Sequence, residues 1–184
     1  MSRVFFVRWR RALRRRRPWL WAALALAGCS DPVRQAAIEA LGPEDPRVAP
    51  GPLHRPGQPC LVCHGEGGGA TPMSAAGTVY RMAGDATPAA GAEVTLRDAA
   101  RTAVVAEVNC AGNFYVYARR FAPTLPLWAS VRLGDESIAM ESPLHRDGDC
   151  ASCHGEPAGP ASAGPIFVAD DARAAAGLPR AVCP

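Results

Sequence analysis

Residues 93–108 read EVTLRDAARTAVVAEV. Apolar and polar side chains alternate in Glu93–Arg97, and the second run, Ala103–Val108, is rich in β-branched valine. Alternation with period two, in segments rich in β-branched residues, is typical of half-buried β-strands. The stretch therefore predicts two strands of a sheet that buries one of its faces.

Further strands of the same type are predicted on both sides of this stretch. They are Thr78–Met82, Phe114–Tyr117 and Trp128–Leu133. Turn residues such as Gly84-Asp85, Gly112-Asn113 and Gly134-Asp135 separate them. Several short strands at this spacing indicate a small antiparallel β-sandwich. We expect this sandwich over residues 77–140 and a mainly β fold for the chain.

Three segments of the predicted sandwich resemble the carboxypeptidase regulatory-like family of transthyretin-type β-sandwiches. They are Gly77-Thr78-Val79-Tyr80, Gly91-Ala92-Glu93-Val94-Thr95-Leu96 and Gly112-Asn113-Phe114-Tyr115. The resemblance implies a rigid spacer or docking domain and brings no catalytic residues with it. Cys110 departs from the family pattern, which has polar residues before Gly-Asn-Phe.

A repeated sequence lies on either side of the predicted sandwich. Residues 53–66, LHRPGQPCLVCHGE, match residues 144–156, LHRDGDCASCHGE, with one residue deleted. Both copies contain the pattern Cys-x-x-Cys-His. A repeat of this kind predicts two copies of one local structure, and we expect two loop-rich modules, at 53–76 and 141–184.

The pattern Cys-x-x-Cys-His is typical of c-type haem attachment, because two thiols at this spacing bind the haem vinyl groups and the histidine ligates the iron. We expect two covalent haems, the first at Cys60, Cys63 and His64 and the second at Cys150, Cys153 and His154. One alternative is a zinc site made by the four cysteines, although 86 residues separate the two pairs and the histidines then have no role. A thioredoxin-like redox motif is another alternative, but its βαβ context is missing.

The sixth ligand of each iron is predicted from the same repeat. His54 and His145 occupy matching positions and are the histidines that the attachment motifs leave over. If both bind iron, neither haem has a position open to substrate, which favours electron transfer over catalysis. Met140 is the alternative ligand at the second haem. In a further alternative, His54 and His145 are solvent-exposed loop residues that bind no iron.

We identify no organic substrate. The rival functions are a peroxidase-like haem enzyme with one five-coordinate iron and a non-redox interaction lipoprotein.

The first 28 residues resemble an export signal. Eight arginines precede Pro18, and the short apolar run Trp19–Ala27 follows. Leu26-Ala27-Gly28-Cys29 resembles the bacterial lipobox, which implies that Cys29 is lipidated, becomes the N-terminus and anchors the protein. Residues 29–52 then form a proline-rich tether, with a short helix from Asp31-Pro32 to Gly42-Pro43.

Without the first 28 residues, twelve arginines face seventeen acidic residues, a net charge of −5. This negative net charge indicates that the exported chain has no basic surface for nucleic acid.

Of the seven cysteines, Cys110 and Cys183 have no other role, so in an oxidising compartment we expect them to form a disulfide. Two free thiols are the alternative.

The segments 26–29, 53–66 and 144–156 together resemble the lipid-anchored multihaem cytochromes of Gram-negative bacteria. The resemblance implies an electron carrier of the cell envelope that faces the periplasm, with the outer membrane favoured by Ser30, or one at the cell surface. Its expected partners are the membrane, through the lipid, and redox partner proteins. The inserted sandwich does not belong to that family pattern.

Overall fold

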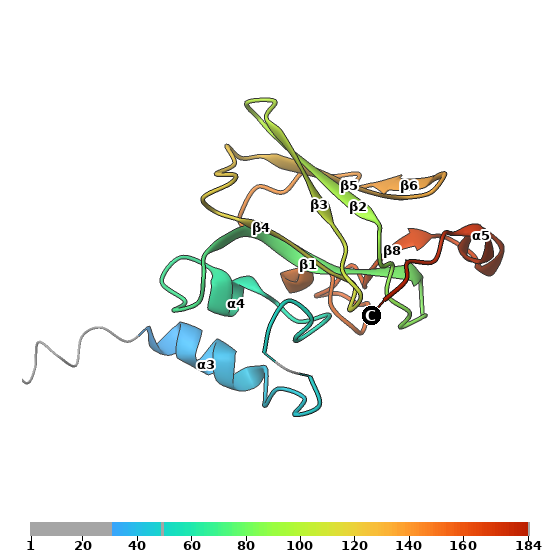
Figure 1. Cartoon of the computed structure of the whole chain (residues 1–184). Coiled ribbons are helices and arrows are strands. Elements are labelled where there is room, and N and C mark those ends of the chain that lie inside the picture. The colour runs from blue at the N-terminus through green and yellow to red at the C-terminus, as the bar shows by residue number, and fades with distance from the viewer. Residues whose placement is uncertain (1–30, 49, 184) are drawn as a thin grey trace, which may run out of the picture. The chain divides into compact units, whose positions relative to one another are not determined.

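The computed structural model describes residues 31–48 and 50–183, and Figure 1 shows that it consists mainly of strands. The chain divides into two units, residues 1–39 and 40–184. The predicted export signal and the predicted lipid on Cys29 lie outside the described residues. No helix in the described part is long and apolar enough to cross a membrane.

The helix α3, Pro32–Ala40, begins and ends where the sequence predicts. Asp31 caps it, because its Oδ1 accepts hydrogen bonds from the N–H groups of Val33 at 3.0 Å and Arg34 at 3.1 Å. Gly42, with φ of 68°, follows its last turn in the left-handed conformation that glycine adopts readily.

The first sheet is built around the strand β1, Met73–Met82. β1 pairs antiparallel with β4, Asn113–Tyr117, and parallel with β7, Gly148–Asp149, and β8, Ile166–Ala169. Residues 75–79 of β1 are all buried, as expected for a strand that is covered on both faces.

The second sheet contains residues 93–108, which form its first two strands. Its strands are β2, Glu93–Asp98, β3, Ala103–Glu107, β5, Leu127–Leu133, and β6, Glu136–Ala139. Their order is β3-β2-β5-β6, and every pair is antiparallel. In the turn between β2 and β3, the buried Asp98 carboxylate accepts hydrogen bonds from the N–H groups of Thr102 at 2.8 Å and Thr124 at 3.0 Å.

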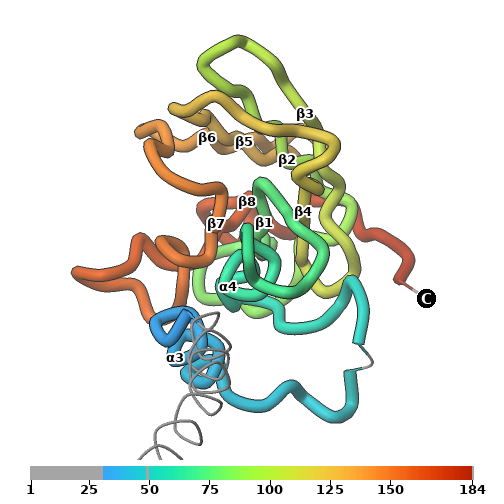
Figure 2. Tube along the Cα trace, turned by 90° about the vertical axis from the view of Figure 1, so that its left-hand side faces the viewer, coloured from blue at the N-terminus to red at the C-terminus, as the bar shows by residue number. Residues whose placement is uncertain are grey.

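The two sheets share one hydrophobic core, and they appear as two layers in Figures 1 and 2. The first sheet contributes Ala75, Val79, Phe114 and Val116, and the second contributes Val94, Leu96, Val104, Ala106, Leu127, Val131 and Leu133. The predicted β-rich fold is confirmed, with one difference. The first sheet is mixed, because β7 and β8 from the C-terminal segment join β1 in parallel.

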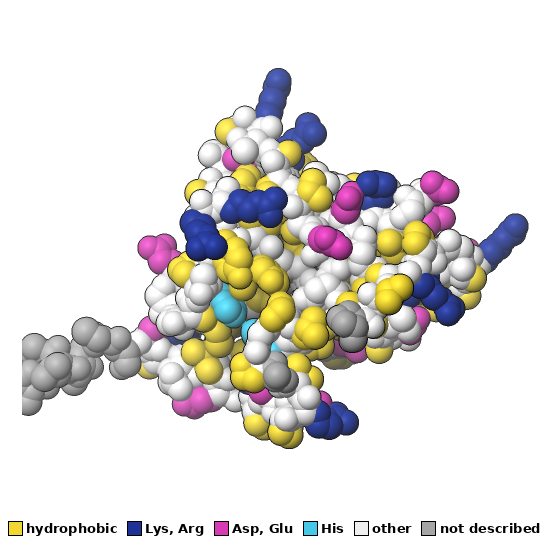
Figure 3. Space-filling view, in the orientation of Figure 1, with side chains coloured by type: hydrophobic (Ala, Val, Ile, Leu, Met, Phe, Trp, Pro, Cys, Tyr) yellow, Lys and Arg dark blue, Asp and Glu magenta, His cyan; other side chains and the backbone are white. Residues whose placement is uncertain are grey.

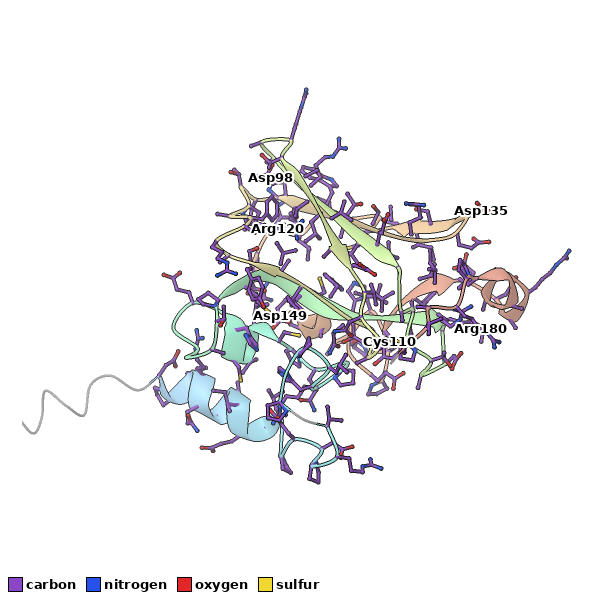
Figure 4. All side chains as sticks on the ribbon, in the orientation of Figure 1. Asp98, Cys110, Arg120, Asp135, Asp149 and Arg180 are labelled. Atoms are coloured by element: carbon purple, nitrogen blue, oxygen red, sulfur yellow. A yellow bond between two sulfur atoms is a disulfide. The ribbon has the colours of Figure 1, made fainter. Side chains whose placement is uncertain are left out.

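The C-terminal segment is tied to the sheets in two ways. Cys110 and Cys183 form a disulfide with a Cα–Cα distance of 5.7 Å, as the cysteine count predicts. The Arg81 guanidinium of β1 donates hydrogen bonds to the carbonyl oxygens of Ala175, Leu178 and Pro179, at and beyond the end of the helix α5, Ala172–Gly177. Figure 4 labels Cys110 and Arg180 in this region.

Candidate functional site

The first Cys-x-x-Cys-His sequence forms a single helical turn. Within the short helix α4, Leu61–His64, the N–H groups of Cys63 and His64 donate to the Cys60 carbonyl at 3.2 and 2.9 Å. The His64 Nδ1 lies 3.0 Å from the carbonyl oxygen of Thr71. Metal-ligating histidines commonly donate their second ring N–H to a backbone carbonyl in this way. The Nε2 of His64 is then the nitrogen that remains to bind a metal.

The second sequence forms the same turn. The 3-10 helix η1, Cys150–Ser152, begins it, and the N–H groups of Cys153 and His154 donate to the Cys150 carbonyl at 3.2 and 2.8 Å. The His154 Nδ1 lies 2.9 Å from the carbonyl oxygen of Gly164. Both copies of the repeat therefore share one local structure, with each histidine oriented through Nδ1.

A cavity lies beside each turn. The first, of about 330 Å³, has Cys60 and His64 among its lining residues, together with Gly51, Pro52, His54, Thr71, Met73, Asn113, Phe114, Tyr115 and Tyr117. The second, of about 460 Å³, has Cys150 and His154 among its lining residues, mostly with apolar side chains that include Val79, Val94, Phe114, Ile138, Met140, Leu144, Ile166 and Phe167. Volumes of this size are typical of sites for cofactors and small molecules.

His54 faces His64 across the first site. The two ring centroids are 5.9 Å apart, and the ring planes are inclined by 30°. The His54 Nδ1 contacts the Gly51 carbonyl oxygen, so its Nε2 is also left for a metal. The side-chain amide of Asn113 holds the loop in place by donating to the carbonyl oxygens of His54 at 3.0 Å and Pro52 at 3.3 Å.

His145 lies differently from its counterpart. It is exposed, and it is absent from the described residues that line the second cavity, whereas Met140 lines that cavity. The N–H and carbonyl groups of the preceding residue, Leu144, bond to Leu127 at 2.7 and 2.8 Å, and its side chain packs against the core. Successive side chains of an extended segment point to opposite sides, so His145 points away from the core.

The two sites meet at Asp149, whose carboxylate is 6% exposed and has one oxygen, Oδ1, without a hydrogen-bond partner. Burial, and then the charge of Asp147, raise its pKa to about 6, while the N–H groups of Leu61 and Cys60 act in the opposite direction. Asp149, which directly precedes the second motif, is therefore a neighbour of α4 in the first (Figure 4).

Phe114 is a second link between the sites, because it lines both cavities. It is 1% exposed. A Cβ at Gly77 would lie 2.8 Å from the Cys150 Cβ and 3.0 Å from the Phe114 Cε1, so only glycine lets β1 approach both residues. Sequence reasoning identified neither Asp149 nor Phe114 as part of the site, since their positions follow from how the strands pair.

Comparison with family models, curated proteins and solved structures finds no match.

The thiols do not resemble those of disulfide oxidoreductases. Burial, and then the charge of Asp149, raise the pKa of Cys60 to about 11 and that of Cys150 to about 12. Redox-active Cys-x-x-Cys motifs instead lower the pKa of a thiol to make it a nucleophile. Among the described residues, no group of three or more His, Cys, Asp or Glu side chains is arranged to hold a metal ion.

Proposed function

We propose that this chain is an electron carrier of the cell envelope with two covalently attached haems. The observation that carries the proposal is the shared structure of the two Cys-x-x-Cys-His turns, each with a histidine oriented through Nδ1 and a cavity beside it. Haem supplies an iron that accepts and releases one electron. The protein attaches and orients it through Cys60, Cys63 and His64 at one site and Cys150, Cys153 and His154 at the other.

The first site fits a haem held between two histidines. His54 and His64 both line the first cavity, and their imidazoles would hold the iron of a haem bound there. The centroids of His54 and His64 are 5.9 Å apart. His54 is therefore our proposed distal ligand, and it is held by the loop that Asn113 supports.

The second site favours a different ligand. Met140 lines the cavity that contains His154, and His145 is exposed outside it. We therefore assign Met140 rather than His145 to the second haem. Because a methionine ligand raises the reduction potential relative to a histidine, the second site is the more oxidising of the two.

The two sites are close enough to act as a pair. Phe114 forms part of the wall of both cavities, and Asp149 lies near Cys60 and Cys150. Haems bound in these two cavities would therefore share Phe114 as a neighbour. If two protein side chains held each iron, neither haem would have a position open to substrate, which favours electron transfer over catalysis.

Haem content of the purified mature protein tests this proposal. We expect about two haems per polypeptide in a pyridine haemochrome assay, and we expect the haem to stay with the chain after denaturation, since thioethers hold it. A colourless protein containing stoichiometric zinc would overturn the assignment.

The lipid anchor is tested separately. Wild-type protein should fractionate with membranes, and Cys29→Ala should be released or mislocalised, because the acyl chains provide the attachment. Ser30→Ala is the matched control and should remain membrane-bound. Wild-type protein found entirely in the soluble periplasmic fraction contradicts the anchor while leaving the haem assignment untouched.

A further inference from the structure

An aromatic and basic surface lies where the edges of the two sheets meet. β3 is an edge strand of the second sheet and β4 an edge strand of the first. Arg120, just beyond β4, donates to the Val105 carbonyl of β3 at 3.2 Å. Arg119 lies over the Tyr117 ring, 5.1 Å from its centroid, and the Tyr115 and Tyr117 rings are 5.4 Å apart. We call these five residues the Tyr–Arg edge.

This edge continues into the first site. Tyr115 and Tyr117 line the cavity that contains His54 and His64. In Figure 3, histidine, hydrophobic side chains and basic side chains follow one another on one face of the molecule. Val105 is 45% exposed, and Arg119 and Arg120 are exposed. The surface that a partner would meet next to the first site is therefore apolar, aromatic and positively charged.

The positive charge of this surface is not neutralised within the described part of the chain. The ion pairs found there involve other arginines, namely Arg34, Arg47, Arg55 and Arg132. The nearby Asp98 is buried and bonded to backbone N–H groups, which leaves Glu107 at the end of β3 as the exposed carboxylate of that strand.

Charge is also divided along the sequence. Residues 97–120 contain four arginines and two acidic residues, whereas residues 133–171 contain one arginine and eight acidic residues. The second motif belongs to the acidic segment, and the Tyr–Arg edge belongs to the basic one. A protein with a negative surface is therefore steered towards the first site rather than the second.

We infer that the Tyr–Arg edge is the docking surface for an acidic redox partner protein. This inference rests on the proposed function and names the kind of partner that meets the first site. Tyrosine and arginine are favoured at the centres of protein interfaces, and complementary charge raises the rate of encounter. In each encounter one electron is transferred, so that the partner is oxidised by one electron as the first site is reduced by one.

Charge reversal at the edge tests the inference in the haem-loaded protein. The variant is Arg119→Glu/Arg120→Glu, and Arg173→Glu on α5 is the control. The probes are two oxidants of opposite charge, ferricyanide and hexaammineruthenium(III), each of which takes one electron from the reduced protein. At low ionic strength the double variant should react roughly tenfold more slowly with ferricyanide and faster with hexaammineruthenium. Both differences should shrink at high salt.

A binding measurement supplies a readout that needs no haem. Fluorescein-labelled poly-L-glutamate should bind wild type and Arg173→Glu at low salt, as followed by fluorescence anisotropy, and should not bind the double variant. Equal binding by the double variant, or no binding by wild type, overturns the docking surface. A protein without haem refutes the proposed function instead, and the poly-L-glutamate result still decides the inference.

Discussion

The two copies of the repeat differ in the residues before the first cysteine. In the first copy Leu53 is 43% exposed and His54 lines the cavity. In the second copy Leu144 packs against the core and His145 is exposed. The same dipeptide therefore faces opposite ways in the two copies.

The partners of each segment explain this difference. Leu144 is bridged to Leu127, and Gly148–Asp149 pairs with β1, so the second copy enters its turn as extended chain. The first copy is four residues Pro56-Gly57-Gln58-Pro59 where the second has three, Asp147-Gly148-Asp149. It also turns through positive φ at Arg55 and Gly57. The Cys-x-x-Cys-His turn thus follows from local sequence, whereas the direction in which the preceding histidine faces depends on what the sheets impose on the flanking chain.

The largest expected effect comes from removing one attachment pair at a time. Wild-type protein should titrate in two steps separated by roughly 0.2 V, since axial ligands set haem potentials over about 0.8 V. Cys60→Ser/Cys63→Ser should retain the higher step, and Cys150→Ser/Cys153→Ser the lower one, with one haem each. Two wild-type haems of equal potential would remove the difference that we assign to the ligands.

The distal ligands can be distinguished by spin state. Met140→Ala should make one of the two haems partly high-spin in the oxidised absorption spectrum, and His54→Ala should do the same at the other, because each change opens a coordination position. His145→Ala is the matched control and should leave the spectrum unchanged. If His145→Ala becomes high-spin and Met140→Ala does not, the second haem has two histidine ligands. A high-spin haem in wild type would favour the enzyme alternative.

The two sheets differ in how much of each could be predicted from the sequence. Three strands of the second sheet, β2, β3 and β5, were predictable because Glu93–Arg97 alternates and all three segments are bounded by turn residues and contain β-branched or aromatic residues. β6, β7 and β8 were missed, since segments of two to four residues are too short to show a period. The parallel pairing of β7 and β8 with β1 is, in addition, a long-range contact that no local pattern encodes.

The same limit applies within the candidate site. The shared local structure of the two Cys-x-x-Cys-His copies and the Cys110–Cys183 pairing could be predicted, because the repeat and the cysteine count are properties of the sequence itself. The outward position of His145 could not be, because it depends on the bridge between Leu144 and Leu127. Asp149 stands where the first copy has Pro59, and this difference was the one sequence signal of its separate role.

The Cys110–Cys183 disulfide should stabilise the two motifs to different extents. The second motif lies within the loop that the disulfide closes, and the first motif lies outside it. Cys110→Ser/Cys183→Ser should lower the free energy of unfolding by up to about 4 kcal/mol, because the unfolded chain regains the entropy of a long loop. Hydrogen exchange should increase more around residues 144–156 than around 53–66. Equal increases in both segments would show that the bond does not support the second site in particular.

Leu53 and Leu144 occupy matching positions in the repeat, and replacing each with alanine should have a smaller effect on stability than removing the disulfide. Leu144→Ala should cost about 1–2 kcal/mol of unfolding free energy, because its side chain is partly buried against the core. Leu53→Ala should cost less than about 0.5 kcal/mol, because that side chain is exposed at the surface. Chemical denaturation measures both. Equal losses would contradict the opposite orientations of the two copies.

The last comparison concerns Asp149, which stands where the first copy has Pro59. Its pKa in the folded protein is raised to about 6, above the value of about 3.9 for an unperturbed aspartate. Between these two values the folded state holds a proton that the unfolded state releases, so the contribution of Asp149 to stability falls as pH rises through this window. Above pH 6 the carboxylate is ionised in both states, and the full cost of burying its charge remains.

Asp149→Asn removes that charge and with it this pH dependence. The stability of the variant relative to wild type should therefore be more favourable at pH 7.5 than at pH 4, by on the order of 1–2 kcal/mol. Denaturation of both proteins at the two pH values gives this difference directly, and the titration of all other groups cancels in it. Asp147→Asn is the control: its charge adds to the shift at Asp149, so it should produce a smaller change of the same sign. The stability difference between Asp149→Asn and wild type could instead be the same at both pH values or change in the opposite direction. Either result would mean that the charge of the buried Asp149 carboxylate is already compensated in the folded protein.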